Sequence, residues 1–352
     1  MFIRFFFMAL LSSALTAFSA GQSSTWLEFP GKAGLSGAGT RIVLISGDEE
    51  YRSEESMPML AKILSERHGF HCTVLFAIDA DTGIINPNNQ TNIPGLEALA
   101  KADVMVIATR YRQLPAEQLR WVHDFVKAGK PVIGLRTATH AFTGEAETEG
   151  FKWKNFGLVV LGETWVNHHG KHKVEGARAV IEPANADHPV LKGVKNIFGP
   201  SDVYGVIHLN PEARILLRGE VTTTLDPASP AVAGAQNNPM MPLAWLREYQ
   251  VPGGKRGRAF CSTIGAAVDL VSEDLRRLLV NAVYDFSGKT VPAKADVRFV
   301  DPFEPSFYGF LDTEAWTSRA IKPADFDLGK ATRPFDRVVV PAGYRPASGA
   351  AQ

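Results

Sequence analysis

The sequence has little cysteine, no net charge and, beyond its first residues, no long apolar run. Its 352 residues include two cysteines, and 37 lysines and arginines balance 37 aspartates and glutamates. This balance argues against nucleic acid or an anionic membrane as a main partner. Cys72 and Cys261 lie in apolar, strand-like runs without a C-x-x-C pattern, so no catalytic thiol is expected. They could form one disulfide in an oxidising compartment, but we expect two buried free thiols.

The apolar stretch at the N-terminus has the features of a secretory signal peptide. Arg4 supplies a positive start, residues 5–11 are apolar and residues 14–20 are mostly small. We therefore predict that residues 1–20 are a signal peptide and that the protein is periplasmic or secreted. An uncleaved anchor is the alternative, although the run is short for a bilayer span. No later segment approaches about 18 uninterrupted apolar residues, so no membrane span is expected in the mature chain.

The first half of the chain alternates predicted strands with predicted helices. Short apolar, β-branched runs predict strands over residues 40–46, 72–76, 104–108 and 132–135. Apolar residues at helical spacing predict a helix over 54–68, ended by Gly69, and another that starts near Pro115. This order predicts an α/β fold with a doubly wound, mostly parallel sheet. Ligands of such sheets bind at the carboxyl ends of the strands.

The second half is less regular. Residues 242–249 and 258–264 predict a pair of strands joined by a glycine turn, and Ser272 is a good N-cap for a helix that ends near Gly288. The remaining chain is rich in proline. We predict an α/β domain over residues 21–288 and an extension, residues 289–352, that wraps this domain and has a disordered end.

Polar residues follow the predicted strands: Asp48 and Glu49 after the first, Arg110 after the third, and Arg136 after the fourth. The fourth strand ends in a sharp small-residue turn, where α/β hydrolases and amidotransferases carry a nucleophilic Ser or Cys. Arg136 occupies that position, so a Cys-dependent glutaminase is excluded.

Arg136 could bind a carboxylate, stabilise an enolate oxygen, or form an ion pair with Asp48, Glu49 or Glu163. His140, expected near a helix N-terminus, could be a neutral base or a packing residue. The sequence leaves both roles of His140 open.

A histidine-rich segment forms the second candidate group. His168, His169 and His172 make an H-H-x-x-H pattern, and imidazoles bind zinc-like divalent metals, here through His168 and His172. Gly170 interrupts a helix there, so a solvated loop, or a loop in which one histidine contacts substrate, are alternatives. Asp202 could be a general base, a metal ligand or an acceptor for sugar hydroxyls.

Two further residues complete the candidate set. Glu163 would supply a second carboxylate of the kind that glycoside hydrolysis needs. Trp165 lies among polar residues and is the best candidate for stacking on a sugar ring.

Several motifs together resemble the ThuA-like family, which is named for trehalose utilisation. They are G-L-R-T-A-T-H-A-F, G-E-T-W-V-N-H-H, D-H-P-V-L-K-G-V, S-D-V-Y and M-P-L-A-W-L-R-E-Y with G-R-A-F-C-S-T-I-G-A, in that order over about residues 40–288. The resemblance implies a flavodoxin-like, class I glutamine amidotransferase-like fold and a sugar-related role. The chain departs from many members at Arg136 and Ala266, where those members carry histidine.

Two functional hypotheses follow. The first is an exported enzyme, a hydrolase, lyase or isomerase, that acts on a disaccharide or keto-sugar by acid–base chemistry. Its catalytic residues would be His140, His168 or His169, and Asp202, and its substrate-binding residues Arg136, Asp48, Glu49, Arg110, Glu163 and Trp165. The second is a non-catalytic sugar-binding or scaffold module. Both imply a small carbohydrate ligand, no required cofactor, and a chain that could form a homo-oligomer. Convergence of the histidines and Asp202 would favour the enzyme.

Overall fold

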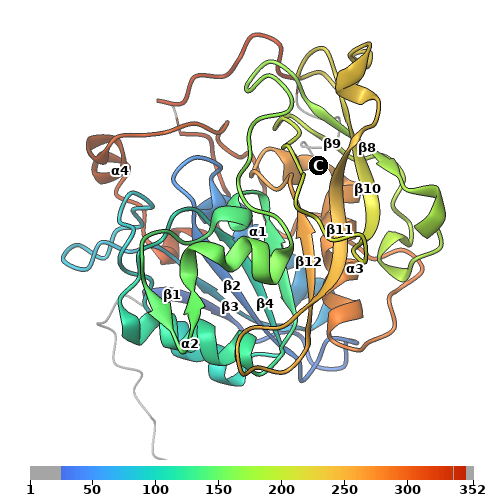
Figure 1. Ribbon diagram of the computed structural model, residues 1–352. Coiled ribbons are helices and arrows are strands. Elements are labelled where there is room, and N and C mark those ends of the chain that lie inside the picture. Colours follow the sequence, from blue (N-terminus) through green and yellow to red (C-terminus); the bar gives the residue numbers. More distant parts are fainter. Residues whose placement is uncertain (1–24, 336, 346–352) are drawn as a thin grey trace, which may run out of the picture.

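One large mixed sheet, with helices on both faces, organises the protein (Figure 1). The structure is a computed structural model that describes residues 25–335 and 337–345. The predicted signal peptide, residues 1–20, and the predicted disordered end, residues 346–352, lie outside the described residues. Within them, no helix combines the length and the apolar character that crossing a membrane requires.

The sheet has ten strands in the order β1-β3-β2-β4-β5-β12-β11-β10-β8-β9. The strands are β1 Trp26–Phe29, β2 Arg41–Gly47, β3 His71–Leu75, β4 Val104–Thr109, β5 Val132–Leu135, β8 Ala177–Ile181, β9 Phe198–Gly199, β10 Arg214–Val221, β11 Met241–Tyr249 and β12 Gly257–Ser262. A separate two-stranded sheet pairs β6, Glu147–Thr148, with β7, Phe151–Lys152. The α-helices are α1 Ser53–His68, α2 Ala116–Lys127, α3 Glu273–Phe286 and α4 Thr313–Arg319.

The central strands β3, β2, β4, β5 and β12 are parallel, whereas β1 and the strands β11, β10, β8 and β9 pair antiparallel. The predicted α/β fold with a parallel centre is therefore confirmed. The antiparallel half joins the same sheet, which makes it mixed.

Alternation along β2 assigns the two faces of the sheet. Ile42 and Leu44 belong to the core that includes residues of α1 and α3, and Val43 and Ile45 belong to the core that includes residues of α2. This period of two is the pattern of a strand buried on both faces. Cys72 on β3 and Cys261 on β12 are buried, unpaired thiols.

The chain after α3 returns to α1. Arg319 on α4 forms ion pairs with Glu54 and Glu55 on α1, and Lys62 of α1 pairs with Asp301 at 2.6 Å. Figure 1 shows α4 at one side of the molecule, well away from α3. Most aromatic side chains of this segment are buried, namely Phe303, Phe307, Tyr308 and Trp316, whereas Phe310 is 58% exposed.

Gly157 allows close packing behind the turn that follows β5. A Cβ atom at this position would lie 1.8 Å from the carbonyl oxygen of Thr139 and 2.5 Å from that of Glu163. Both neighbours are backbone atoms, so neither can move without shifting the turn or the loop.

We predict that Gly157→Ala lowers the free energy of unfolding by about 2 kcal/mol or more, because the added methyl group overpacks two backbone segments. Urea denaturation of the purified protein measures the change. Gly343→Ala is the control, since a Cβ there meets its nearest neighbour at 3.8 Å. Equal stability of the two variants would contradict the prediction.

Candidate functional site

The candidate site lies where β2, β4 and β5 end. Shortly after each of these strands, one residue other than glycine has a positive φ: Arg52 at 61°, Tyr111 at 50° and Arg136 at 47°. L-residues rarely adopt this left-handed conformation, and it concentrates at functional sites. The predicted sharp turn after β5 is therefore present, and it begins with Arg136.

Arg136 is buried and binds the loop that carries Asp202. Its Nη1 donates to the carbonyl oxygens of Asp202 at 2.5 Å and Thr263 at 2.7 Å. Its Nη2 donates to Asp202 Oδ1 at 3.1 Å and to the hydroxyl of Tyr51 at 3.0 Å. The guanidinium carbon lies 3.7 Å from the ring centroid of Tyr204. These contacts fix both the backbone and the carboxylate of Asp202.

Of the roles considered for Arg136, the ion pair is present, but its partner is none of the predicted acids, Asp48, Glu49 and Glu163. Its side chain is 1% exposed, and its ion-pair partner is Asp202. The rings of Tyr51 and Tyr204 both pack against the guanidinium, at 4.5 and 3.7 Å from its carbon to the ring centroids, which contributes to its burial.

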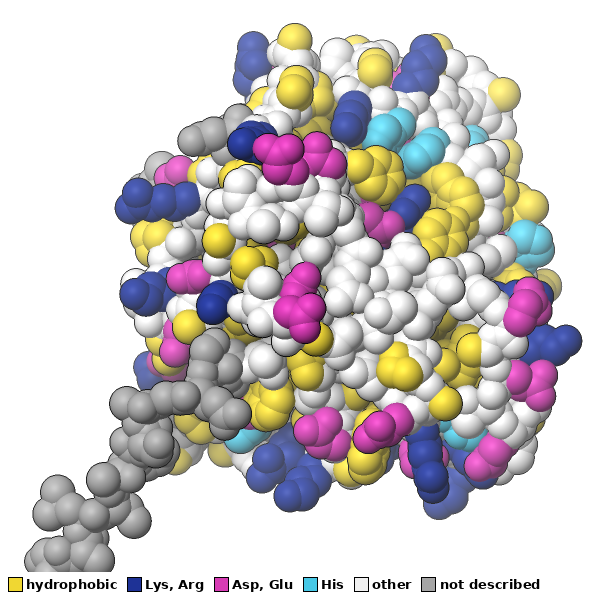
Figure 2. Space-filling view, turned by 90° about the vertical axis from the view of Figure 1, so that its left-hand side faces the viewer, with side chains coloured by type: hydrophobic (Ala, Val, Ile, Leu, Met, Phe, Trp, Pro, Cys, Tyr) yellow, Lys and Arg dark blue, Asp and Glu magenta, His cyan; other side chains and the backbone are white. Residues whose placement is uncertain are grey.

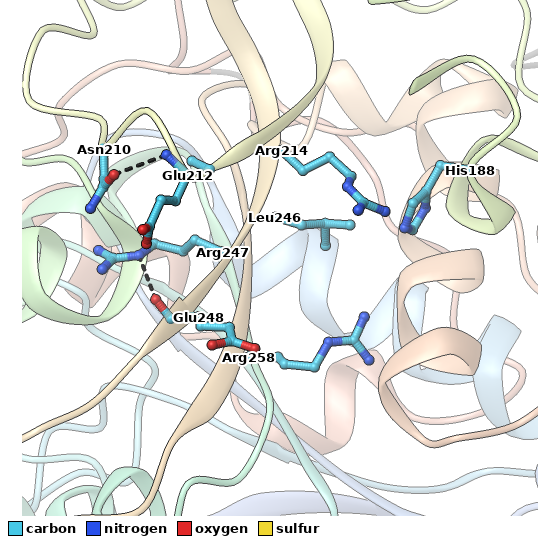
Figure 3. Close-up of a pocket in the computed structure, with 9 residues that line it drawn as sticks. His188, Asn210, Glu212, Arg214, Leu246, Arg247, Glu248 and Arg258 are labelled. Atoms are coloured by element: carbon cyan, nitrogen blue, oxygen red, sulfur yellow. Dashed lines mark hydrogen bonds between the residues drawn. The ribbon is translucent and has the colours of Figure 1, made fainter. Parts of the chain in front are cut away.

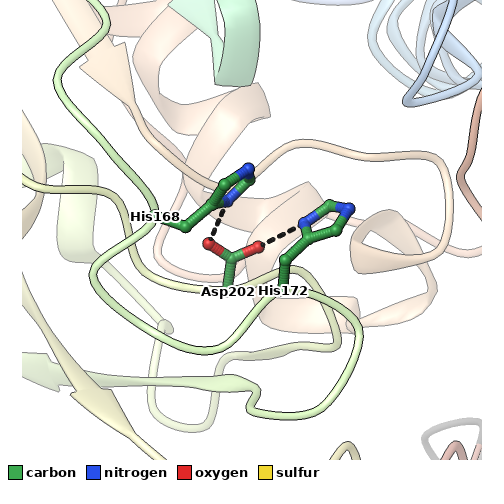
Figure 4. A group of neighbouring side chains, drawn as sticks. All are labelled: His168, His172 and Asp202. Carbon is green, nitrogen blue, oxygen red and sulfur yellow. Dashed lines mark hydrogen bonds and ion pairs between the residues drawn. The ribbon is translucent and has the colours of Figure 1, made fainter.

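Asp202 brings two of the predicted histidines together (Figure 4). Its Oδ2 lies 2.6 Å from Nδ1 of His168, and its Oδ1 lies 3.0 Å from Nδ1 of His172. Burial alone would raise the pKa of Asp202, but Arg136 and the two histidines lower it well below its usual range. The ionised carboxylate can only accept, so both Nδ1 atoms carry the donated protons.

His172 is held between two carboxylates. Its second ring nitrogen, Nε2, lies 3.2 Å from Oε1 of Glu50. Burial lowers the pKa of His172, but the hydrogen bonds to Asp202 and Glu50 outweigh it, so the pKa is raised above its ordinary value. His168 lacks such a second carboxylate partner in the described part of the chain, so its Nε2 is the free ring nitrogen of the pair.

His140 lies beside this group in an aromatic environment. Its ring centroid is 4.9 Å from that of Tyr111, 5.3 Å from that of Trp165 and 6.4 Å from that of Tyr204. Burial, followed by the charges of Arg110 and Arg136, lowers its pKa to about 3. The lowered pKa favours the neutral imidazole that the sequence predicts. His140 does not start a helix, however, but ends a short 3-10 turn, so a helix dipole is not the cause.

Asp48, Glu49 and Arg110 hold the strand ends in place. Asp48 accepts from Thr137 in the turn after β5 at 2.5 Å, which ties β2 to that turn. Glu49 pairs with Arg110 at 2.5 Å and with Arg112 at 2.9 Å. Burial raises the pKa of both acids. Of the three side chains, Arg110 is the most exposed, at 22%.

Two predicted residues point elsewhere. Glu163 is buried and binds the segment at His208, through ring Nδ1 at 2.5 Å and the backbone N–H at 2.8 Å. His169 Nε2 donates to the carbonyl oxygen of Gln236 at 2.7 Å. The structure therefore joins His168, His172 and Asp202 directly and places His140 next to them through the rings of Trp165 and Tyr204. The side chains of Glu163 and His169 form their hydrogen bonds elsewhere.

Several site residues were missed by the sequence reasoning. Glu50 stands in the polar run after β2, so this run was the signal that could have found it. Tyr51 and Tyr204 pack against Arg136, and Tyr308 lies 5.4 Å from the ring of His172. Tyr308 follows Asp202 by over a hundred residues, and no local pattern marks it.

The ligand atoms of His168, His172 and Asp202 all lie within 4.8 Å of one another, so these side chains could hold a metal ion. Figure 4 shows the two rings hydrogen-bonded to different oxygens of the carboxylate. Histidine and hydrophobic side chains also gather on one face of the molecule in Figure 2.

A separate cavity of about 360 Å³ lies across the antiparallel strands (Figure 3). His188, Arg214, Leu246 and Arg258 are among its lining residues, and none of the predicted site residues lines it. His188 accepts from the N–H of Val190 at 3.2 Å and so caps the short turn that follows it.

Comparison with protein families identifies the chain. The model of the ThuA family, described as trehalose utilisation, matches residues 41–284, and the protein belongs to this family. Among solved structures, a ThuA-like protein from Parabacteroides merdae is 16% identical over 72% of this chain and 92% of that chain, with a TM-score of 0.44. A ThuA-like protein from Bacteroides uniformis is 13% identical over 70% and 91%, with a TM-score of 0.43. No match is found among curated proteins.

The lowered pKa of His140 predicts a pH-dependent loss of stability. The unfolded chain binds a proton at His140 below its ordinary value of 6.5, whereas the folded chain does so only near 3. Between these values the unfolded state binds more protons, so the free energy of unfolding falls as the pH falls. The largest contribution of one such group is about 1.4 kcal/mol per pH unit.

Urea denaturation between pH 7 and pH 4.5 tests this for the wild type and for His140→Gln, which cannot take up that proton. We expect a shallower fall of stability with pH in the variant. The same pH slope in both proteins would contradict the assignment.

Proposed function

We propose that the protein is a carbohydrate-processing enzyme that uses His168 as its general base and acid. The observation that carries this proposal is the pairing of His168 Nδ1 with the ionised carboxylate of Asp202 at 2.6 Å. A carboxylate that accepts from Nδ1 fixes the tautomer and directs the Nε2 lone pair outward. The His168 side chain is 32% exposed, so a substrate can reach this nitrogen.

His172 and His140, which lie near His168, support proton transfer at the Nε2 atom of His168. Hydrogen bonds to Asp202 and Glu50 raise the pKa of His172, so this ring, beside His168, takes up a proton more readily than a free imidazole does. His140 favours the neutral form, so it can donate or accept a hydrogen bond without adding charge. A base next to a hydrogen-bond donor suits a reaction in which a proton leaves carbon or oxygen and negative charge develops.

The substrate class is a disaccharide or a keto-sugar. Trp165 lies 4.8 Å from both His168 and Tyr204 by ring centroids, so an aromatic surface lies directly beside the base. The C–H face of a sugar ring packs well on such a surface. The family's link to trehalose utilisation supports the same class. The N-terminal sequence supports action outside the cytoplasm, because it has the pattern of a signal peptide.

We predict that His168→Asn lowers kcat by about 10²- to 10⁴-fold, the range for loss of a general base, with a smaller effect on KM. The assay incubates purified mature protein with disaccharides and their 3-keto derivatives and follows the products. His169→Asn is the matched control, since the neighbouring ring contacts the backbone of Gln236 instead. Equal loss in both variants, or full activity in His168→Asn, would contradict the role. Sugar binding without turnover would support a non-catalytic sugar-binding module.

The same side chains support a second proposal, a divalent metal such as zinc. Two imidazoles and a carboxylate are a common zinc ligand set, and their ligand atoms already lie within 4.8 Å. Without a metal, the Nδ1 atoms of both histidines are hydrogen-bonded to the carboxylate of Asp202. Metal and proton would therefore compete for these nitrogens.

We predict that zinc binds more tightly at pH 8 than at pH 6 and releases protons, because His172 must lose the proton that its raised pKa favours. Isothermal titration calorimetry in two buffers of different ionisation enthalpy measures both effects. His172→Ala should abolish binding and His169→Ala should not. Absence of zinc binding by the wild type, or its persistence in His172→Ala, would exclude this site.

A further inference from the structure

The chain beyond the family match forms one side of the candidate site. The N–H of Gly309 donates to the carbonyl oxygen of Glu50 at 2.8 Å, and Arg52 donates to that of Gly309. The N–H and hydroxyl of Ser306 each donate to the carboxylate of Glu55 at 2.7 Å. The family model ends at residue 284, so Ser306 and Gly309 lie outside the part of the chain that it matches.

Tyr308 fixes the segment around Gly309 against the group formed by His168, His172 and Asp202. Its hydroxyl donates to the carbonyl oxygen of Pro200 at 3.1 Å, two residues before Asp202. Its ring centroid lies 5.0 Å from that of Tyr51 and 5.4 Å from that of His172. The position of the next residues is therefore set relative to the groups proposed for catalysis.

Phe310 is exposed although Tyr308 is buried. The Phe310 side chain is 58% exposed, so its ring is open to a ligand. The guanidinium carbon of Arg110 lies 4.9 Å from its ring centroid and 4.7 Å from that of Tyr111. Glu49 holds Arg110 at 2.5 Å, and Tyr111 in turn lies 4.9 Å from His140. The aromatic surface thus continues from His140 outward to Phe310.

We propose that Phe310, with Arg110 and Tyr111, forms a subsite for a second sugar ring. This inference rests on the proposed function and narrows its substrate class to disaccharides and other glycosides with a second ring. The C–H face of that ring would cover the exposed Phe310 ring and remove both from water. Arg110 has donors left after its bond to Glu49, and these would bind ring hydroxyls.

The test compares the binding of trehalose, maltose and cellobiose with that of glucose by saturation-transfer NMR. We expect wild type to bind at least one disaccharide more tightly than glucose. We expect Phe310→Ala to weaken that disaccharide about tenfold and to leave glucose unchanged. Phe310→Tyr, which keeps the ring, should retain wild-type affinity. Leu328→Ala removes another partly exposed apolar side chain of the C-terminal segment and should change nothing.

The inference is overturned if Phe310→Ala binds every sugar as wild type does, if it weakens glucose and disaccharides equally, or if wild type shows no preference for two rings. Because these experiments measure binding and not turnover, they test the subsite separately from the proposed reaction. That reaction fails instead if turnover survives His168→Asn.

Discussion

The buried ion pair between Arg136 and Asp202 is the interaction on which the site depends. A carboxylate that is removed from water favours its protonated form, and a protonated Asp202 could not accept hydrogen bonds from two histidines. The guanidinium of Arg136 reverses that preference. Buried ion pairs are costly to desolvate and add little stability by themselves. Here the pair organises the groups around it, because Arg136 also holds the backbone of Asp202 and the hydroxyl of Tyr51.

From this pair, charge alternates outward through the site. Arg136 is followed by the carboxylate of Asp202, then by His172, and then by the carboxylate of Glu50. Hydrogen bonds and ion pairs link neighbouring members of this series, and they lower the pKa of Asp202 and raise that of His172. His168 joins this series at Asp202 but stands at its edge, where a ring nitrogen remains free. Its position explains why the proposal assigns proton transfer to His168 and a supporting role to His172.

The central strands and the polar residues at their ends were predictable, because periodicity and turn residues act locally. The turn at Arg136 was predictable for the same reason. The direction of each side chain was not. His168 forms a bridge with Tyr204, and in extended chain successive side chains point to opposite sides, so the adjacent His169 points away. Glu163 and Asp202 looked equivalent as carboxylates, yet only Asp202 lies opposite Arg136. Tyr308 reaches the site through a tertiary contact that no local pattern records.

An arginine at the strand-end turn changes where chemistry can occur. In α/β hydrolases such a turn presents an exposed nucleophile, whereas here it carries a buried cation in contact with Tyr51 and Tyr204. A group so buried cannot attack a substrate, but it can hold the opposite loop at fixed distance and fixed charge. The proposed base, His168, lies on a separate segment and is linked to this cation through Asp202. The turn therefore keeps its place beside the site while its role passes from reacting to positioning.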